Sequence, residues 1–181
     1  MIQEWLKKSE SIPRKHGLYR MEAILSALGN PERGLKSIHI AGTNGKGSTA
    51  AMVTAFAKAH GLRVGTFTSP HMDSIRERIQ LDGVPLEEEP FWQAASVVRE
   101  VESRLFEEWG AFNYFEILTA MMFVVFQQEA VDLAIIEVGI GGLLDNTNVG
   151  HPLVSVITTI GPSRLTRKYV GRNYGSKSRD Y

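Results

Sequence analysis

The feature that most constrains the fold is a glycine-rich stretch between a strand pattern and a helix pattern, Ile38-His-Ile-Ala-Gly-Thr-Asn-Gly-Lys-Gly-Ser-Thr49. A β-prone run over 36–41 leads into it, and a helical pattern over 48–60 follows at once. This order places free backbone N–H groups, a lysine and hydroxyls at a helix N-terminus, where the unpaired donors and the helix dipole together favour phosphate. The apolar face of the predicted helix comprises Met52, Val53, Phe56 and Ala57.

The stretch departs from the usual phosphate-loop pattern G-x4-G-K-[ST]. Ile40 stands in the place of the first glycine, and Gly47 separates Lys46 from Ser48. The alternative is an ordinary strand-to-helix turn in which glycines only supply positive φ. Because glycines, a lysine and hydroxyls occur together between a strand and a helix, we favour a nucleotide-phosphate loop.

Composition indicates a single domain with a sizeable core, since 43% of the 181 residues are hydrophobic. The absence of cysteine excludes disulfides, thiolate metal sites and a thiol nucleophile, and is compatible with a cytoplasmic protein. The first residues lack the apolar core of a signal peptide. The longest apolar run, 120–126, is too short to span a membrane, so we expect no membrane association.

A second strand pattern over 62–67 completes a βαβ unit, which predicts a parallel sheet. Thr68-Ser69-Pro70-His71 follows it directly, where ligands of open α/β sheets gather. Pro70 favours an extended Ser69 with its hydroxyl presented, although a plain turn explains these residues equally well. A hairpin is expected over 76–83, helices over 91–109 and 114–128, and a last strand over 153–159. These elements predict an α/β, three-layer fold with a mostly parallel sheet, here incomplete.

Glu137 is the unusual residue of a buried strand pattern over 131–139. A carboxylate near the end of such a strand costs several kcal/mol unless it is paired or binds a metal. Beside a phosphate loop, this is where Mg²⁺ would be held, with phosphates completing its oxygen shell. We favour that interpretation over a structural, salt-bridged Glu137.

These residues together resemble the N-terminal ATPase domain of the folylpolyglutamate synthase/dihydrofolate synthase family, within the Mur-ligase superfamily. The resemblance runs from about residue 18 to 161 and explains the unusual glycine loop. Its matching pieces are Arg20-Met21-Glu22, Leu28-Gly29-Asn30-Pro31, His39-Ile-Ala-Gly-Thr-Asn-Gly-Lys-Gly-Ser48, Thr68-Ser-Pro-His71, Glu77-Arg78-Ile79, Phe115-Glu116 with Thr119, Glu137-Val-Gly-Ile-Gly-Gly142 and Asp145-x-Thr-Asn148. Leu143 departs from it, because the family has an arginine there.

The resemblance implies that ATP phosphorylates a carboxylate of dihydropteroate or of a folate, and that L-glutamate then attacks the acyl phosphate to form an amide. Lys46 would be catalytic, and Ser69 and Glu137 would hold Mg²⁺. The ATP phosphates would be bound by Gly42, Thr43, Asn44, Gly45, Lys46, Gly47 and Ser48. The pterin site would be bordered by Asn113, Tyr114, Phe115, Glu116, Leu144, Asp145 and Asn146.

The agreement ends near Gly161, so we divide the chain into an ATP-binding domain over 1–161 and an aberrant tail over 162–181. The tail has six Lys or Arg against Asp180, which leaves residues 1–161 with a net charge of about −5. Reading 167–181 one nucleotide later permits a peptide with the Lys-Ala-Gly-Ile segment of the family. We therefore expect an out-of-frame, disordered tail, and the nucleotide sequence of the gene tests this.

Two functions remain open. The first is the ligase, for which the family's C-terminal domain is missing here, so we expect weak ATP binding and no ligation of glutamate. The second is a non-catalytic nucleotide-binding module or pseudoenzyme. Gly47 and Thr68-Ser-Pro disfavour a generic P-loop kinase or GTPase, and the tail lacks any nucleic-acid motif. We expect a monomer that binds small molecules and no nucleic acid.

Overall fold

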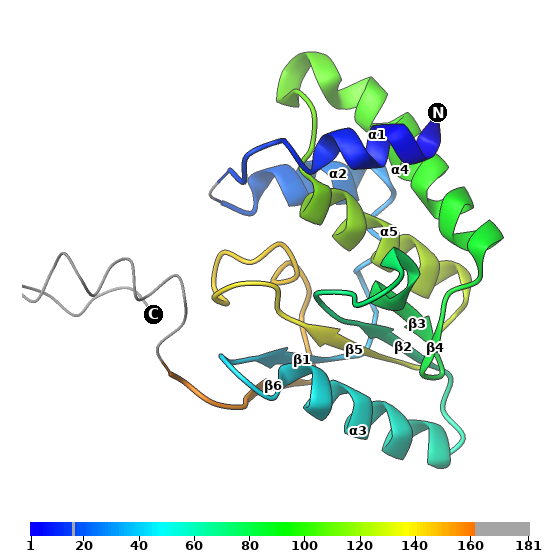
Figure 1. Ribbon diagram of the computed structural model, residues 1–181, viewed down its shortest axis with the longest axis vertical. Helices are drawn as coiled ribbons and strands as arrows, with labels where there is room; N and C mark the ends of the chain where they lie inside the picture. The colour runs from blue at the N-terminus through cyan, green and yellow to red at the C-terminus, as the bar shows by residue number, and fades with distance from the viewer. Residues whose placement is uncertain (16, 162–181) are drawn as a thin grey trace, which may run out of the picture.

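The computed structural model describes residues 1–15 and 17–161 around a six-stranded sheet (Figure 1). Its strands are β1 (Ser37–Ala41), β2 (Val64–Phe67), β3 (Ile79–Leu81), β4 (Val84–Pro85), β5 (Leu133–Glu137) and β6 (Val154–Ile157). Their order across the sheet is β4-β3-β2-β5-β1-β6. β2, β5, β1 and β6 run parallel, whereas β3 and β4 form the predicted hairpin and add an antiparallel edge.

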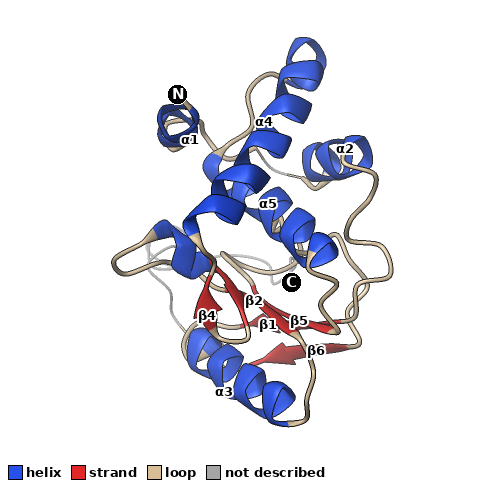
Figure 2. Cartoon of the chain, turned by 90° about the vertical axis from the view of Figure 1, so that its right-hand side faces the viewer, coloured by secondary structure: helices blue, strands red, loops and turns tan. Residues whose placement is uncertain are grey.

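The helices lie on both faces of the sheet, as the predicted three-layer α/β fold requires. Figures 1 and 2 show α3 (Lys46–Ala59) alone on one face. On the other face α5 (Tyr114–Gln128) lies against the strands, and further helices pack around it. These are α1 (Ile2–Ser9), α2 (Tyr19–Ala27) and α4 (Glu88–Trp109), while the short 3-10 helix η1 (Ile75–Arg78) precedes β3.

Helix α5 forms the centre of the main core because it is apolar on every side. All its residues from Phe115 to Phe126 are buried, as expected of a helix without a polar face. The ring of Phe126 lies so close to β2 that a Cβ on Gly65 would come within 2.6 Å of it. Gly65 therefore allows α5 to approach the sheet closely.

The predicted apolar face of the helix after the glycine loop was partly wrong. Val53 and Ala57 pack toward the sheet, but Met52 and Phe56 are 56% and 69% exposed. The helix covers the middle of the sheet with its small side chains, Ala50 and Thr54 included, and this turns Met52 and Phe56 toward the flank. The helix also begins at Lys46, two residues earlier than the hydrophobic pattern indicated.

Other boundaries agree with the sequence patterns to within about three residues. The predictions for the tail, 162–181, fall outside the described residues. None of the described helices is long and apolar enough to cross a lipid bilayer.

Candidate functional site

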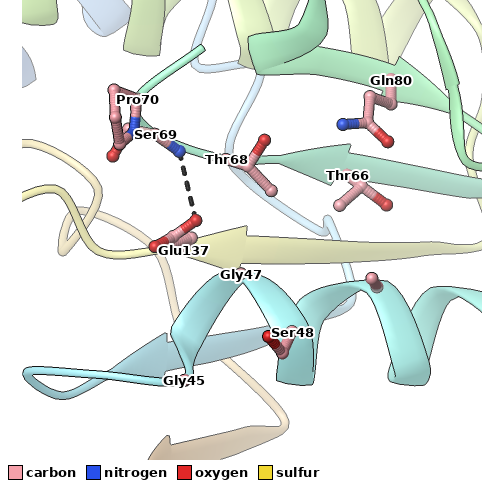
Figure 3. A pocket seen from close by; sticks show the side chains of 10 residues that line it. Gly45, Gly47, Ser48, Thr66, Thr68, Ser69, Pro70, Gln80 and Glu137 are labelled. Atoms are coloured by element: carbon pink, nitrogen blue, oxygen red, sulfur yellow. Dashed lines mark hydrogen bonds between the residues drawn. The ribbon is translucent and has the colours of Figure 1, made fainter. Parts of the chain in front are cut away.

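The carboxyl ends of β1, β2 and β5 meet at one edge of the sheet, where a cavity of about 380 Å³ opens (Figure 3). The glycine loop and the start of α3 form one wall, and the segment after β2 forms another. Its lining residues are Gly45, Gly47, Ser48, Ala51, Thr66, Thr68, Ser69, Pro70, Gln80 and Glu137. The predicted phosphate loop and the predicted Mg²⁺ residues therefore lie in one cavity.

The glycine loop is shaped by left-handed backbone and by contacts to the chain after β6. Gly42 and Gly45 have φ values of +135° and +85°, which favour glycine. A Cβ on Gly42 would come within 2.1 Å of Thr158 Oγ1. The amide of Thr43 donates to the Thr159 carbonyl at 2.7 Å. No side chain caps α3, so its first N–H groups can bind an anion.

Lys46 and Ser69 both contact the carboxylate of Glu137. Lys46 Nζ lies 3.7 Å from Glu137 Oε1, and the Ser69 amide donates to Oε2 at 3.1 Å. Figure 3 shows the carboxylate between the Ser69 loop and the start of α3. Burial raises the pKa of Glu137, while the Ser69 N–H and the Lys46 ammonium oppose that rise. The Glu137 carboxylate is thus stabilised by the Lys46 ammonium and the Ser69 amide.

Ser69 and Glu137 fit a magnesium ion by the chemistry of their oxygens, because Mg²⁺ prefers hard oxygen ligands and commonly takes few from the protein. Both line the same cavity as the phosphate loop, and Glu137 carries the only carboxylate among the residues that line it. Within residues 1–15 and 17–161, no group of three or more His, Asp or Glu side chains is arranged to hold a metal. A metal here would therefore share its coordination with phosphate and water.

The segment between β2 and η1 is held by the side chains of Glu77 and Arg78. Both belong to the pieces that resemble the family, but no role was predicted for either. The Glu77 carboxylate accepts from the amides of Met72, Asp73 and Ser74, and these bonds lower its pKa. Arg78 Nε donates to His71 Nδ1 at 2.9 Å, and its guanidinium lies 5.4 Å from the Tyr114 ring centre. Arg78 thereby connects this segment to the start of α5.

Among the predicted substrate residues at the start of α5, Asn113 and Glu116 use their side-chain oxygens in hydrogen bonds within the protein. Asn113 Oδ1 accepts from the amides of Phe115 and Glu116, and Glu116 Oε2 accepts from the Asn113 amide at 2.7 Å. Arg20, 2% exposed, donates to Glu116 Oε1 at 2.9 Å and to the carbonyls of Trp109 and Ala111. Sequence reasoning assigned no role to Arg20, although an arginine among the buried positions of α2 was a usable signal.

The glycine-rich loop after β5 contacts the start of α5. A Cβ on Gly139 would come within 2.5 Å of the Phe115 ring and 3.1 Å of Asp145 Oδ2. Asp145 is buried and accepts from the amides of Ile140 and Thr147. Leu144 is 56% exposed, whereas Asn146 is mostly buried. The structure thus brings the predicted substrate segments 113–116 and 144–146 together.

Comparison with known proteins identifies relatives of this architecture, although no family model matches the chain. Dihydrofolate synthase/folylpolyglutamate synthase of Bacillus subtilis is 40% identical over 165 residues, which cover 90% of this chain and 38% of the relative. The crystal structure of folylpolyglutamate synthase from Thermotoga maritima superposes with a TM-score of 0.83 at 40% identity, over 92% of this chain and 39% of that one. The chain belongs to the folylpolyglutamate synthase/dihydrofolate synthase family.

Further members of this family show the same relationship. Folylpolyglutamate synthase of Lacticaseibacillus casei is 43% identical, over 78% of this chain and 33% of the relative. A folylpolyglutamate synthase in complex with AMPPCP and folate superposes with a TM-score of 0.83 at 39% identity, over 90% of this chain and 41% of that one. The chain thus spans about 40% or less of the length of these family members, and the resemblance and fold class inferred from sequence are confirmed.

Proposed function

We propose that the chain carries the ATP- and Mg²⁺-binding part of a ligase that joins L-glutamate to dihydropteroate or to a folate. The contacts of Lys46 and Ser69 with Glu137, beside the cavity that Ser69, Glu137 and the phosphate loop line, carry this proposal. Membership of the family supports it, as do related structures described as complexes with ADP, AMPPCP and folate.

In the proposed reaction, a carboxylate oxygen of the pteroate or folate attacks the γ-phosphorus of ATP, and ADP leaves. The amine of L-glutamate then attacks the carbonyl of the acyl phosphate, an amide forms, and phosphate leaves with a proton lost from the amine. The amides of the loop from Gly42 to Ser48 hold the phosphates, and Lys46 offsets the charge that develops during transfer. Lys46 turns from Glu137 toward the nucleotide when the phosphates bind.

Ser69 and Glu137 would hold Mg²⁺ through the hydroxyl and the carboxylate. When bound, the ion would neutralise part of the phosphate charge. Before it binds, Glu137 is a buried carboxylate with a raised pKa and a single nearby ammonium. The Glu137 carboxylate would therefore lose little bound water when it binds a divalent cation.

The pterin would lie where segments 113–116 and 144–146 meet. Tyr114 and Leu144 supply the accessible surface. Asn113, Phe115, Glu116, Asp145 and Asn146 shape the site from beneath, because they are mostly buried and the polar groups of Asn113, Glu116 and Asp145 are bonded within the protein. Polar contacts to the pterin would then come from backbone atoms and from Tyr114.

The second candidate is a nucleotide-binding module without ligase activity, for which the phosphate loop and its cavity would suffice. Calorimetry with AMPPCP and Mg²⁺, with and without folate, separates the two functions. Binding of both ligands supports the ligase site, and nucleotide binding without folate binding supports the module. We expect the 181-residue chain to bind ATP without ligating glutamate. ADP formation that depends on both folate and glutamate would contradict that expectation.

A further inference from the structure

A hydrogen-bond chain connects β1 to the glycine-rich loop over 139–148. His39 Nε2 lies 2.8 Å from Thr147 Oγ1, and the Thr147 hydroxyl donates to Asp145 Oδ1 at 2.6 Å. A hydroxyl has one proton, which Asp145 receives here, so His39 Nε2 must be the donor to Thr147. Burial lowers the pKa of His39, although Asp145 opposes this, so the ring is neutral at neutral pH with its proton on Nε2.

Asp145 closes the loop at both ends. Its Oδ2 accepts from the Ile140 amide at 2.9 Å, and its Oδ1 also accepts from the Thr147 amide at 3.2 Å. Asp145 therefore fixes the position of the loop between Ile140 and Thr147. His39 fixes it from outside, because β1 is hydrogen-bonded to β5 on one side and to β6 on the other.

The loop that His39 holds presents apolar side chains to solvent. Ile140, Leu143 and Leu144 are 49%, 69% and 56% exposed. They follow Gly139, which packs against the Phe115 ring at the start of α5. Such an apolar rim suits the flat face of an aromatic ring system, provided that the loop is held in one position.

We propose that His39 is a positioning residue for the pteridine-bearing substrate, acting through Thr147 and Asp145 on the loop that borders it. This rests on the proposed function, which places the pterin at this loop. The His39 side chain lies on the α5 face of β1, opposite the Ile38 and Ile40 side chains that pack toward α3, the helix that begins at Lys46. Its loss should therefore affect the folate and spare the nucleotide.

The test compares His39→Leu, which removes the donor, with His39→Gln, whose amide nitrogen can stand in for Nε2. Thr147→Val removes the middle member of the same chain, and His60→Leu, at an exposed histidine that caps the C-terminus of α3, is the matched control. Calorimetry with folate and with AMPPCP–Mg²⁺, together with amide hydrogen exchange at Ile140 and Thr147, supplies the readouts.

For His39→Leu and Thr147→Val, we expect folate to bind at least about tenfold more weakly and the amide of Ile140 to exchange at least about tenfold faster, and in His39→Leu the amide of Thr147 as well. AMPPCP affinity should change by less than about twofold, and His39→Gln should recover most of both losses. His60→Leu should resemble the unsubstituted chain.

Unchanged exchange in both variants, or an equal loss of folate and nucleotide affinity, would overturn the role of His39. If His39→Leu failed to fold, Thr147→Val and His39→Gln would decide. An unsubstituted chain that bound no folate would refute the ligase site itself, and exchange at Ile140 and Thr147 would then decide whether His39 fixes the loop.

Discussion

Lys46 contacts Glu137 in the free protein and is expected to gain a contact with phosphate when nucleotide binds. Its ammonium lies 3.7 Å from Glu137 and 16% of its side chain is exposed. Lys46→Met keeps the length of the side chain and removes the charge, so ATP–Mg²⁺ should bind at least about tenfold more weakly. Lys58→Met is the control, because Lys58 lies on the same helix and donates only to the Asp82 carbonyl. Equal effects of the two substitutions in calorimetry would contradict the role of Lys46.

Glu137 is a buried carboxylate whose charge is unfavourable for stability. Burial raises its pKa in the folded protein above the unfolded value, so the folded state binds the proton more tightly. Its contribution to stability is therefore full below the unfolded pKa and is lost as pH rises through the folded pKa.

Glu137→Gln should remove that loss and raise the free energy of unfolding at neutral pH by about 1 kcal/mol. The gain should shrink toward acidic pH, where Glu137 is already protonated, and urea denaturation at both pH values measures it. Mg²⁺ should no longer strengthen ATP binding in this variant. A less stable Glu137→Gln protein at neutral pH would show that the pair with Lys46 outweighs the desolvation of the carboxylate.

At the scale of elements, a buried ion pair fastens α2 to the start of α5. The side chains of Arg20 and Glu116 are each 2% exposed, and Arg20 also bonds the carbonyls that precede α5. Arg20→Met leaves Glu116 buried without its cation, which costs about 3–5 kcal/mol. The double substitution Arg20→Met/Glu116→Gln should recover part of this loss, as measured by urea denaturation. Additive losses in the two single variants and the double variant would show that the two side chains do not act as a pair.

The glycine loop also packs closely against the chain after β6, which leaves no room for a side chain at Gly42. Gly42→Ala places a Cβ against Thr158 Oγ1 at a φ of +135°, and strain of this kind costs on the order of 1–3 kcal/mol. Gly42→Ala/Thr158→Ala removes the contact with Thr158 Oγ1 but leaves the backbone strain and the Thr159 backbone atoms at 3.0 Å, so it should recover only part of the thermal stability. If the single variant were as stable as the unsubstituted chain, the loop would have to adopt another conformation.

The strands and the phosphate loop were predictable because they depend on local patterns. Glycines after an apolar run predicted the phosphate loop, and the position of Glu137 in a buried strand pattern indicated a paired or metal-binding carboxylate. The pairing of Arg20 with Glu116 was not predictable, because 95 residues separate the two and neither pattern contains the other. The same holds for His39 and Thr147, which meet only once the sheet order brings β1 beside β5. The roles assigned to the site residues stay predictions.

At the scale of the whole molecule, the β6 edge of the sheet exposes apolar side chains. Among residues 1–15 and 17–161, β6 pairs only with β1, and Val154 and Ile157 are 50% and 65% exposed. Phe56 on α3 adds further apolar surface. Such edges template association, so we expect the monomer inferred from sequence to self-associate at roughly micromolar concentrations and above.

Ile157→Lys should weaken that association by placing a charge on the edge, without changing the circular dichroism spectrum. Light scattering over a concentration series measures the effect, and Arg104→Lys on α4 serves as a surface control. A chain that stays monomeric throughout the series would show that this edge is already protected.

The position of β5 between β2 and β1 has a consequence for the order of events during synthesis. When β1 leaves the ribosome it has no strand to pair with, because its neighbours are β5 and β6, and residues 42–132 must be made first. At about 5–20 residues per second, the phosphate loop waits for several seconds without the strand that aligns it. We therefore expect that nucleotide has no part in the early stages of folding and binds only after β5 has been made.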